Sequence, residues 1–255
     1  MSLEKGGGIV AFQTVFRRVE LKYMITPEQK ERVIEAMREH MEPDAYGRSV
    51  IRNIYFDTDS YRLIRGSIEK PAYKEKLRVR SYKRIDDGDR IFVELKKKHK
   101  HVVYKRRLSL PERDAMEWLC GRRTRLDDTQ ISREVDYFLE FYGGLAPKAF
   151  LSYEREAYYS KEDSSFRVTF DGNVLCRFDD LSLKSEVYGE RILPEGCVLM
   201  EIKCSGGMPL WMAHLLSSER IYKTSFSKYG TAYREHIFPR LKNRDEIDKK
   251  GESYA

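Results

Sequence analysis

Basic side chains recur at every second position of the segment KLRVRSY, residues 76–82, where Lys76, Arg78 and Arg80 alternate with apolar residues. Residues two apart in a β-strand point to the same face of a sheet, so these three side chains would share one side. The planar guanidinium group of arginine can bind two oxygens of a phosphate at once. The segment therefore predicts a strand whose basic side could bind an anion.

The same period of two recurs in five further segments, FRRVELKY (16–23), RIFVELKKK (90–98), HVVYKRRLSL (101–110), SFRVTFD (165–171) and CVLMEIKC (197–204). The cations on the polar side of these strands are Arg18, Lys22, Arg78, Arg80, Lys96, Lys98, Lys105, Arg107, Arg167 and Lys203, and the acids are Glu20, Glu94, Asp171 and Glu201. This alternation is typical of an antiparallel sheet with one face on a core. The sequence therefore predicts a sheet with one strongly basic face.

Two environments could accommodate such a face. Solvent covers the polar side of many half-buried sheets. Like charges directly opposite each other destabilise a sheet, however, and a chain of phosphates enclosed by the strands would remove that repulsion. The few carboxylates would then suit Mg²⁺ or Mn²⁺, which binds one or two carboxylates together with phosphate oxygens. We favour the enclosed polyanion over the solvated face.

Length and charge set the frame for this sheet. The chain has 255 residues, 41% of them hydrophobic, which is enough to bury one good core. A formal net charge of +7 favours an anionic partner such as nucleic acid, phosphate or a membrane surface. No stretch approaches the roughly 20 apolar residues of a membrane span. We predict a flexible tail over residues 1–13, a single domain over 14–240 and a charged tail over 241–255.

Helices are expected between the strands. Thr26 is a typical N-cap, with Pro27 at the first helical position and Gln29 completing a capping box. The spacing of apolar residues predicts further helices over 111–120 and 130–142, from Pro209 onwards, and after the segment SKYG at 227–230.

Cysteine usage bears on the cellular compartment. Cys120, Cys176, Cys197 and Cys204 show no CxxC spacing, and the amino-terminal segment MSLEKGGGIV lacks the features of a signal peptide. We expect buried free thiols in a reducing compartment, and therefore a cytoplasmic protein.

Nine segments in order carry a resemblance to a known family: RVELKY (18–23), IYFDT (54–58), KLRVRSY, FVELKKK (92–98), YKRR (104–107), YEREAY (153–158), FRVTFD (166–171), MEIKCSG (200–206) and SFSKYGTAY (225–233). Together they resemble the VTC domain, the polyphosphate polymerase branch of the CYTH-like triphosphate tunnel metalloenzymes. The resemblance implies an α+β fold, a closed antiparallel β-barrel with helices packed on the outside. It also implies an ATP:polyphosphate phosphotransferase that uses Mn²⁺ or Mg²⁺ and has ATP and inorganic polyphosphate, not nucleic acid, as partners.

The resemblance also assigns roles to residues. Phosphate binding is implied for Lys22, Arg78, Arg80, Lys96, Lys105, Arg155 and Arg167. Lys228 would close the site, and Lys223 is an additional candidate. Further cations of the same face are Lys98, Arg107 and Lys203. Glu201 would hold the metal. Glu20 and Glu94 could ligate it too, or could pair with neighbouring Lys22 and Lys96, and we favour pairing.

Arg155 is placed by the resemblance alone. In the segment AFLSYEREAYY, residues 149–159, it shares its phase with Leu151 and Tyr153, so alternation does not decide which way it points. We follow the resemblance and expect Arg155 on the basic face.

One position departs from the hydrolytic relatives, which open with a Glu-x-Glu-x-Lys motif. Arg18 stands at the first glutamate position, which leaves Glu20 and Lys22. One carboxylate fewer means less capacity for a metal-activated water, so the change favours transfer over hydrolysis. An inorganic triphosphatase and a non-catalytic binder of polyphosphate or nucleic acid stay as alternatives. Against nucleic acid, Tyr23 and Tyr104 fall on the apolar phase of their strands rather than among the basic residues.

Overall fold

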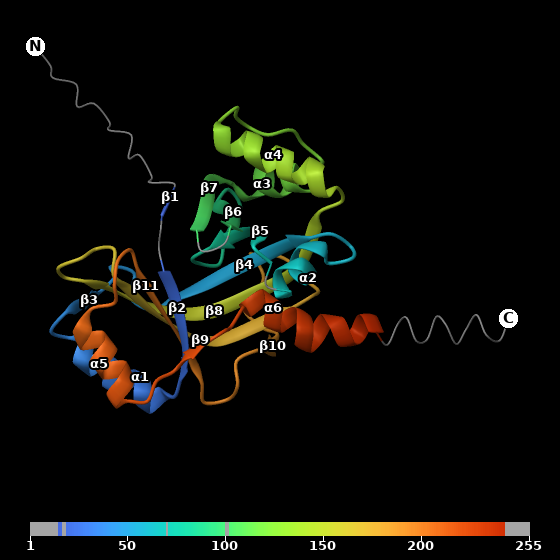
Figure 1. Ribbon diagram of the computed structural model, residues 1–255. Coiled ribbons are helices and arrows are strands. Elements are labelled where there is room, and N and C mark those ends of the chain that lie inside the picture. The colour runs from blue at the N-terminus through green and yellow to red at the C-terminus, as the bar shows by residue number, and fades with distance from the viewer. Residues whose placement is uncertain (1–14, 17–18, 70, 100–101, 243–255) are drawn as a thin grey trace, which may run out of the picture.

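The structure is a computed structural model that describes residues 15–16, 19–69, 71–99 and 102–242. The predicted tail over 1–13, Arg18 and residues 243–255 lie outside this part. Its strands are β1 (Val15–Phe16), β2 (Val19–Ile25), β3 (Met41–Pro43), β4 (Ser49–Asp57), β5 (Tyr73–Ser81), β6 (Arg90–His99), β7 (Val102–Pro111), β8 (Ala146–Ser160), β9 (Arg167–Arg177), β10 (Glu190–Arg191), β11 (Val198–Cys204) and β12 (Lys223–Thr224). Its helices are α1 (Pro27–Met37), α2 (Arg62–Ile68), α3 (Glu112–Leu119), α4 (Gln130–Tyr142), α5 (Leu210–Ser218), α6 (Lys228–Ala232) and the π-helix η1 (Tyr233–Ile237). The α+β class is confirmed (Figure 1).

The strands join into one antiparallel sheet with the order β1-β7-β6-β5-β4-β8-β9-β11-β2-β12. The expected closed barrel is wrong for the described residues, since no ladder joins the two ends of this order. The reason lies in the strand that would close it. Residues 15–16 pair with β7 as β1, whereas residues 19–25 pair with β11 as β2. The sheet nevertheless curls, as shown by the approach of Lys96 on β6 to Glu20 on β2, with 3.3 Å between Nζ and Oε2.

Two of the three hydrophobic clusters lie on the outer face of the curl, beneath α1, α3, α4 and α5. A third joins β4 and β8 to α6 and η1. Figure 1 shows these helices around the sheet. Helices α3 and α4 pack on one part of the outer face, burying Leu77, Val79, Val93 and Leu95. Helices α1 and α5 pack on another, burying Tyr23, Val168, Phe170, Met200 and Ile202. In β2, β5, β6 and β7 the apolar phase therefore points outward to these helices, and the basic phase points into the curl.

The predicted helices are present, and one further helix was missed. Helix α1 carries the predicted capping box, and α4 has the predicted bounds. Helix α2 begins at a residue without a side-chain cap, so it shows no local start signal. Asp57 of β4 substitutes for the cap, since its carboxylate accepts hydrogen bonds from the backbone N–H groups of Leu63 and Ile64 at 2.9 and 3.0 Å. A cap that lies on the preceding strand is invisible to a search for N-cap residues next to the helix.

The carboxy-terminal boundary differs from the prediction. The last helical segment continues through residue 242, and Leu241 packs against the cluster of Ile51, Tyr55 and Tyr233. The folded part therefore runs past the predicted boundary at residue 240.

The four cysteines are free, as predicted. Cys176 and Cys204 are buried, whereas Cys120 and Cys197 are only partly so. A search of the described residues for a helix with the length and apolarity of a membrane span found none.

The cap of α1 offers a test of local stability. Thr26 Oγ1 accepts a hydrogen bond from the Gln29 backbone at 3.2 Å, and the Gln29 side chain accepts one from the Thr26 backbone at 3.0 Å. We expect Thr26→Ala to lower the free energy of unfolding by about 1 kcal/mol, measured by chemical denaturation. Thr26→Ser keeps the oxygen and serves as the control. Equal stability of the two variants would show that the cap contributes nothing.

Candidate active site

The registers of the ladders place the predicted basic residues on one surface. Residues directly opposite each other in antiparallel strands point to the same side, so each ladder partner extends the surface across the sheet. Two rows cross β5, β6 and β7: Arg78–Glu94–Arg107 and Lys76–Lys96–Lys105. Two rows cross β9, β11 and β2: Arg167–Lys203–Glu20 and Thr169–Glu201–Lys22. We call this surface the inner face; it also includes Lys74, Arg80, Lys98, Arg155 and Asp171.

Glu94 is the acid that balances the first row. Its side chain is 1% exposed, and its carboxylate lies 2.7 Å from Arg78, 2.8 Å from Lys105 and 3.8 Å from Arg80. Arg107 Nε adds a contact at 2.8 Å. Burial opposes ionisation, but these cations hold the pKa of Glu94 well below its usual range. In the structure Glu94 thus pairs with these cations rather than with Lys96.

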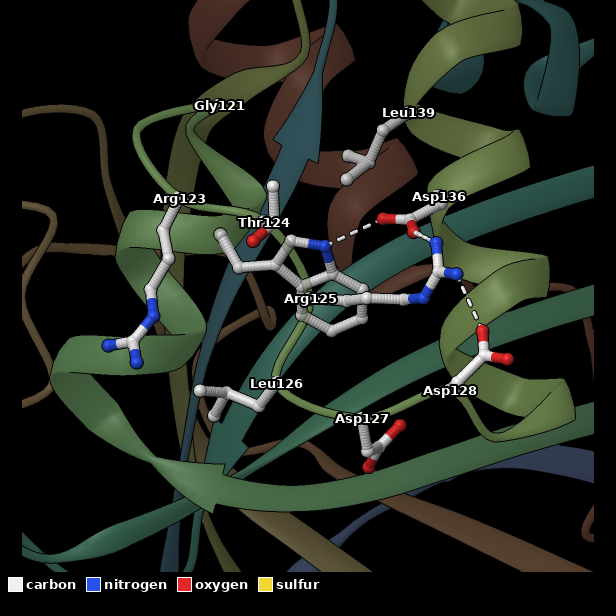
Figure 2. Close-up of a pocket in the computed structure, with 10 residues that line it drawn as sticks. Gly121, Arg123, Thr124, Arg125, Leu126, Asp127, Asp128, Asp136 and Leu139 are labelled. Carbon is white, nitrogen blue, oxygen red and sulfur yellow. Dashed lines mark hydrogen bonds and ion pairs between the residues drawn. The ribbon is translucent and has the colours of Figure 1, made fainter.

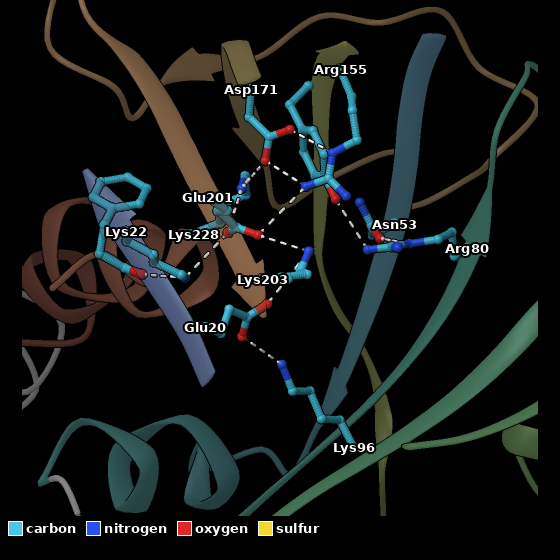
Figure 3. A network of polar contacts seen from close by, with 12 residues as sticks. Glu20, Lys22, Asn53, Arg80, Lys96, Arg155, Asp171, Glu201, Lys203 and Lys228 are labelled. Atoms are coloured by element: carbon cyan, nitrogen blue, oxygen red, sulfur yellow. Dashed lines mark hydrogen bonds and ion pairs between the residues drawn. The ribbon is translucent and has the colours of Figure 1, made fainter. Parts of the chain in front are cut away.

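Glu201 and Asp171 balance the cations of the opposite side (Figure 3). Glu201 lies 3.4 Å from Lys22, 3.4 Å from Lys203 and 3.7 Å from Lys228. The Asp171 carboxylate, which is fully buried, accepts a hydrogen bond of 2.5 Å from Lys228. Burial opposes the charge of Glu201, yet the surrounding ammonium groups hold its pKa well below the usual value. Lys228 thus bridges two buried carboxylates.

Glu20 pairs with Lys96 at 3.3 Å and with Lys203 at 3.6 Å. The predicted partner Lys22 instead contacts Glu201 and donates a 2.7 Å hydrogen bond to the carbonyl of Phe226. Burial raises the pKa of Glu20, but the lysines outweigh it and lower that pKa to about 2. Pairing is therefore the observed state of Glu20, with exchanged partners.

Arg155 points to the inner face, as the resemblance implied. Its Nε and Nη2 donate to the two oxygens of Asp171, both at 2.6 Å, and Nη2 lies 3.8 Å from Glu201. Leu151 and Tyr153 share the phase of Arg155 and so lie on the inner face as well. These two positions are not charged because α6 and η1 pack against that end of the inner face. The long strand β8 therefore runs from an apolar end of the inner face to a charged one, which is why its alternation was ambiguous.

Three successive residues, Phe226, Ser227 and Lys228, connect the start of α6 to the inner face. Each of them contacts a residue of a different strand. The carbonyl of Phe226 accepts from Lys22 on β2, the hydroxyl of Ser227 lies 3.1 Å from Lys76 Nζ on β5, and Lys228 binds Asp171 on β9. The segment SFSKYGTAY thus closes one side of the site.

The remaining predicted residues divide into two groups. Arg167 pairs with Asp44 at 3.4 Å and packs over the ring of Tyr159, and Lys98 lies opposite Lys74. Both belong to the inner face. Lys223 does not, because its ladder partner is Tyr23, a residue of the outer core. Its assignment to the site is therefore corrected.

Asp171, Asn53 and Tyr153 are among the residues of the inner face that received no role from the sequence. Asp171 was counted among the acids of the polar phase, and its place opposite Arg155 follows only from the register of β8 and β9. Asn53 and Tyr153 orient Arg80, through contacts of 2.8 Å to Nε and 3.0 Å to Nη2. The phase of FRVTFD was the one signal that could have assigned Asp171.

The acids of the inner face allow a test of the metal expectation. Within the described residues, no group of three His, Cys, Asp or Glu side chains could hold a metal ion by itself. Mg²⁺ and Mn²⁺ are commonly bound by one or two carboxylates together with substrate phosphates. Glu201 and Glu20, which share Lys203, fit such a shared site. Glu94 fits less well, because Arg78 and Lys105 contact its oxygens at 2.7 and 2.8 Å, whereas the cations around Glu201 lie 3.4–3.8 Å from its oxygens.

A separate hollow of about 720 Å³ lies between α4 and the loop that follows α3 (Figure 2). Arg125 bridges Asp128 and Asp136 there at 2.5 and 2.6 Å, and Trp118 donates a 2.7 Å hydrogen bond to Asp136. These charged groups satisfy one another, so the inner face is the stronger candidate for chemistry.

The charge balance of the first row is testable through Glu94. We expect Glu94→Gln to lower the free energy of unfolding at pH 7 by about 3–5 kcal/mol, because it leaves several buried cations without their acid. Denaturant unfolding measures the change. The control is Glu186→Gln, which removes an exposed partner of Arg84 and should change stability by less than about 1 kcal/mol. Similar effects of the two substitutions would contradict the central role of Glu94.

Comparison with solved structures supports the fold. A "putative adenylate cyclase" from Bacillus halodurans is similar with a TM-score of 0.53 and 15% sequence identity, over 84% of this chain and 96% of that one. A "putative adenylyl cyclase" from Hippeastrum with a dominant triphosphatase activity is similar with a TM-score of 0.51 and 17% identity, over 85% of this chain and 95% of that one. At these identities the likeness establishes the fold alone.

Comparison with protein families is more specific. A search of curated proteins returned no match. The family model described as the VTC domain matches residues 17–236, which include every strand of the inner face. This protein therefore belongs to the VTC domain family.

Proposed function

We propose that this protein transfers the γ-phosphoryl group of ATP to a growing chain of inorganic polyphosphate, with Mn²⁺ or Mg²⁺ as the cofactor. The observation that carries the proposal is the inner face, which brings cations from β2, β5, β6, β7, β8, β9 and β11 of a VTC domain onto one concave surface. A string of phosphates matches a surface whose cations are spaced along several strands.

The arginines of this surface are held in place before any phosphate arrives. Arg78 is fixed by Glu94 at 2.7 Å and by the hydroxyl of Tyr55 at 2.9 Å. Arg155 is fixed by both oxygens of Asp171. Donors that need no reorganisation stabilise charge in a transition state most effectively. We assign Arg78, Arg80 and Arg155 to the transferring phosphoryl group, and Lys22, Lys96, Lys105, Arg167 and Lys203 to the phosphates on either side.

The reaction itself asks for little covalent chemistry. The terminal oxygen of the acceptor phosphate attacks the γ-phosphorus of ATP, the bond to the β-phosphate oxygen breaks, and ADP leaves. The attacking oxygen is already largely ionised, so no strong general base is needed. The protein holds the two oxygens in line and excludes competing water. Glu201 and Glu20 would hold the divalent cation, which when bound would offset charge on the donor phosphates.

A triphosphatase is the second candidate, because the similar Hippeastrum structure has a dominant triphosphatase activity. That likeness extends only to the fold. The sequence favours transfer, because Arg18 takes the place of an acid in the opening motif. The inner face adds that Glu94 is enclosed by cations. Fewer free carboxylates leave less capacity to activate a metal-bound water.

The two candidates differ in product. Incubation of the protein with ATP and Mn²⁺ should yield long, acid-labile polyphosphate, resolved by gel electrophoresis, together with ADP. A hydrolase would instead release free phosphate and no polymer. Release of phosphate alone would therefore replace the proposed transfer with hydrolysis.

The assignment of Arg78 predicts a kinetic defect. Arg78→Met should raise the activation free energy by about 2–4 kcal/mol, and so lower kcat by roughly 30- to 1000-fold, because a fixed donor to the moving phosphoryl group is lost. Arg106→Met is the matched control, since Arg106 lies on the outer face of β7 and pairs with Glu134 at 2.9 Å. An undiminished kcat for Arg78→Met in a folded protein would exclude the assigned role.

A further inference from the structure

We propose that Lys76 binds the polyphosphate chain, as one end of a row of lysines formed with Lys96 and Lys105. This inference rests on the proposed function and adds a residue to its substrate site. The register places Lys76 directly opposite Lys96 on β6, and Lys96 directly opposite Lys105 on β7. The lysine row therefore crosses three neighbouring strands on the inner face.

The adjacent row shows how the fold can balance a row of cations without a ligand. In the row Arg78–Glu94–Arg107, an acid lies between two cations. The lysine row has no acid of its own. Lys96 reaches Glu20 across the curl, and Lys105 reaches Glu94 in the adjacent row at 2.8 Å. Like charges directly opposite each other are destabilising, so the lysine row is a place where an added anion would be most stabilising.

Lys76 has the least compensation within this row. Its ammonium group lies 3.1 Å from the hydroxyl of Ser227, a neutral group, and among the described residues it forms no ion pair with an acid. That hydroxyl also accepts a hydrogen bond from the backbone of Gly230 at 3.2 Å. The half-buried ammonium of Lys76 therefore retains donor capacity for a ligand.

The charged groups that influence Lys76 most strongly are themselves cations. They are Lys22 from β2, Lys96 from β6, and Lys74 and Arg78 from its own strand, while the segment before α6 contributes the Ser227 hydroxyl. Burial and these cations lower the pKa of Lys76 to about 7. A polyanion placed over the row would reverse the balance and favour the charged ammonium. Chain binding and protonation of Lys76 are therefore linked, and each strengthens the other.

The chemical type of the residue indicates which step it serves. An ammonium is a compact point charge on a flexible stem and contacts phosphates without fixed geometry, unlike the arginine fork. Lys76 also belongs to a different row from Arg78, which is paired with Glu94. Its contribution is therefore to the affinity for the chain, so KM for a polyphosphate acceptor should change more than kcat.

The test measures binding of inorganic tripolyphosphate to the full chain by isothermal titration calorimetry at pH 6 and pH 8.5. At pH 6, where Lys76 is mostly charged, we expect Lys76→Met to weaken binding about tenfold, the effect of a pKa rise of about one unit on binding. At pH 8.5 the difference should shrink to less than about twofold, because the wild-type lysine has then lost most of its charge. The ligand's own ionisation is the same for both proteins and cancels in the comparison.

Two variants sharpen the result. Lys76→Arg carries a charge at both pH values, so it should bind at least as tightly as wild type at pH 6 and more tightly at pH 8.5. Lys97→Met is the matched control, since Lys97 is the neighbour of Lys96 on the outer face, where it pairs with Glu75 at 3.7 Å. It should retain the wild-type affinity and pH dependence. Thermal unfolding of each variant verifies the fold.

The outcomes separate this inference from the proposed function. If the wild-type protein binds tripolyphosphate and Lys76→Met binds it with the same affinity and the same pH dependence, the role of Lys76 alone is overturned. A failure of the folded wild-type protein to bind tripolyphosphate at either pH would overturn the proposed function and the inference together. Should Lys76→Met not fold, Lys76→Arg decides, and a pH dependence equal to that of wild type would overturn the inference.

Discussion

The structure depends on the balance of charge within a curled sheet. Cations from seven strands point into the same concave space, and they can lie there only because a few acids are placed among them. Glu94 and Glu201 each contact four cations, and both are almost fully buried. The attraction within a buried ion pair offsets the cost of desolvation only where the geometry and hydrogen bonds are good, as they are for Arg155 and Asp171. The arrangement is costly as a way to build a core and is better explained as a site.

The period of two was sufficient to predict the inner face. The outer core of Leu77, Val93 and Ile202, and the inward cations Arg78 and Lys203, follow from alternation alone. The prediction worked in β2, β5, β6 and β7, because the clusters formed with α1, α3, α4 and α5 lie on the outer face there and leave the other face polar. It was uninformative in β8, where the inner face is itself apolar because α6 and η1 pack on it. There the order of the motifs carried the information that alternation lacked.

Pairing between distant strands could not be read from the sequence. The exchanged partners of Glu20 and Lys22 depend on which strands face each other across the curl, and the place of Lys223 depends on its register with β2. Helix α2 was missed for the same reason, since its cap, Asp57, belongs to a strand rather than to the residue before the helix. Local patterns thus predicted elements and faces, whereas the partners of individual charges required the topology.

The split between β1 and β2 has a mechanical consequence. Widening a closed barrel requires the rupture of ladder hydrogen bonds, several at once along a strand. In this sheet, the side chains of Lys96 and Glu20 span the gap instead, and both are partly exposed to water. Such an ion pair contributes only about 0–1 kcal/mol. Separating Lys96 from Glu20 would therefore cost little and would leave every ladder of the described strands intact.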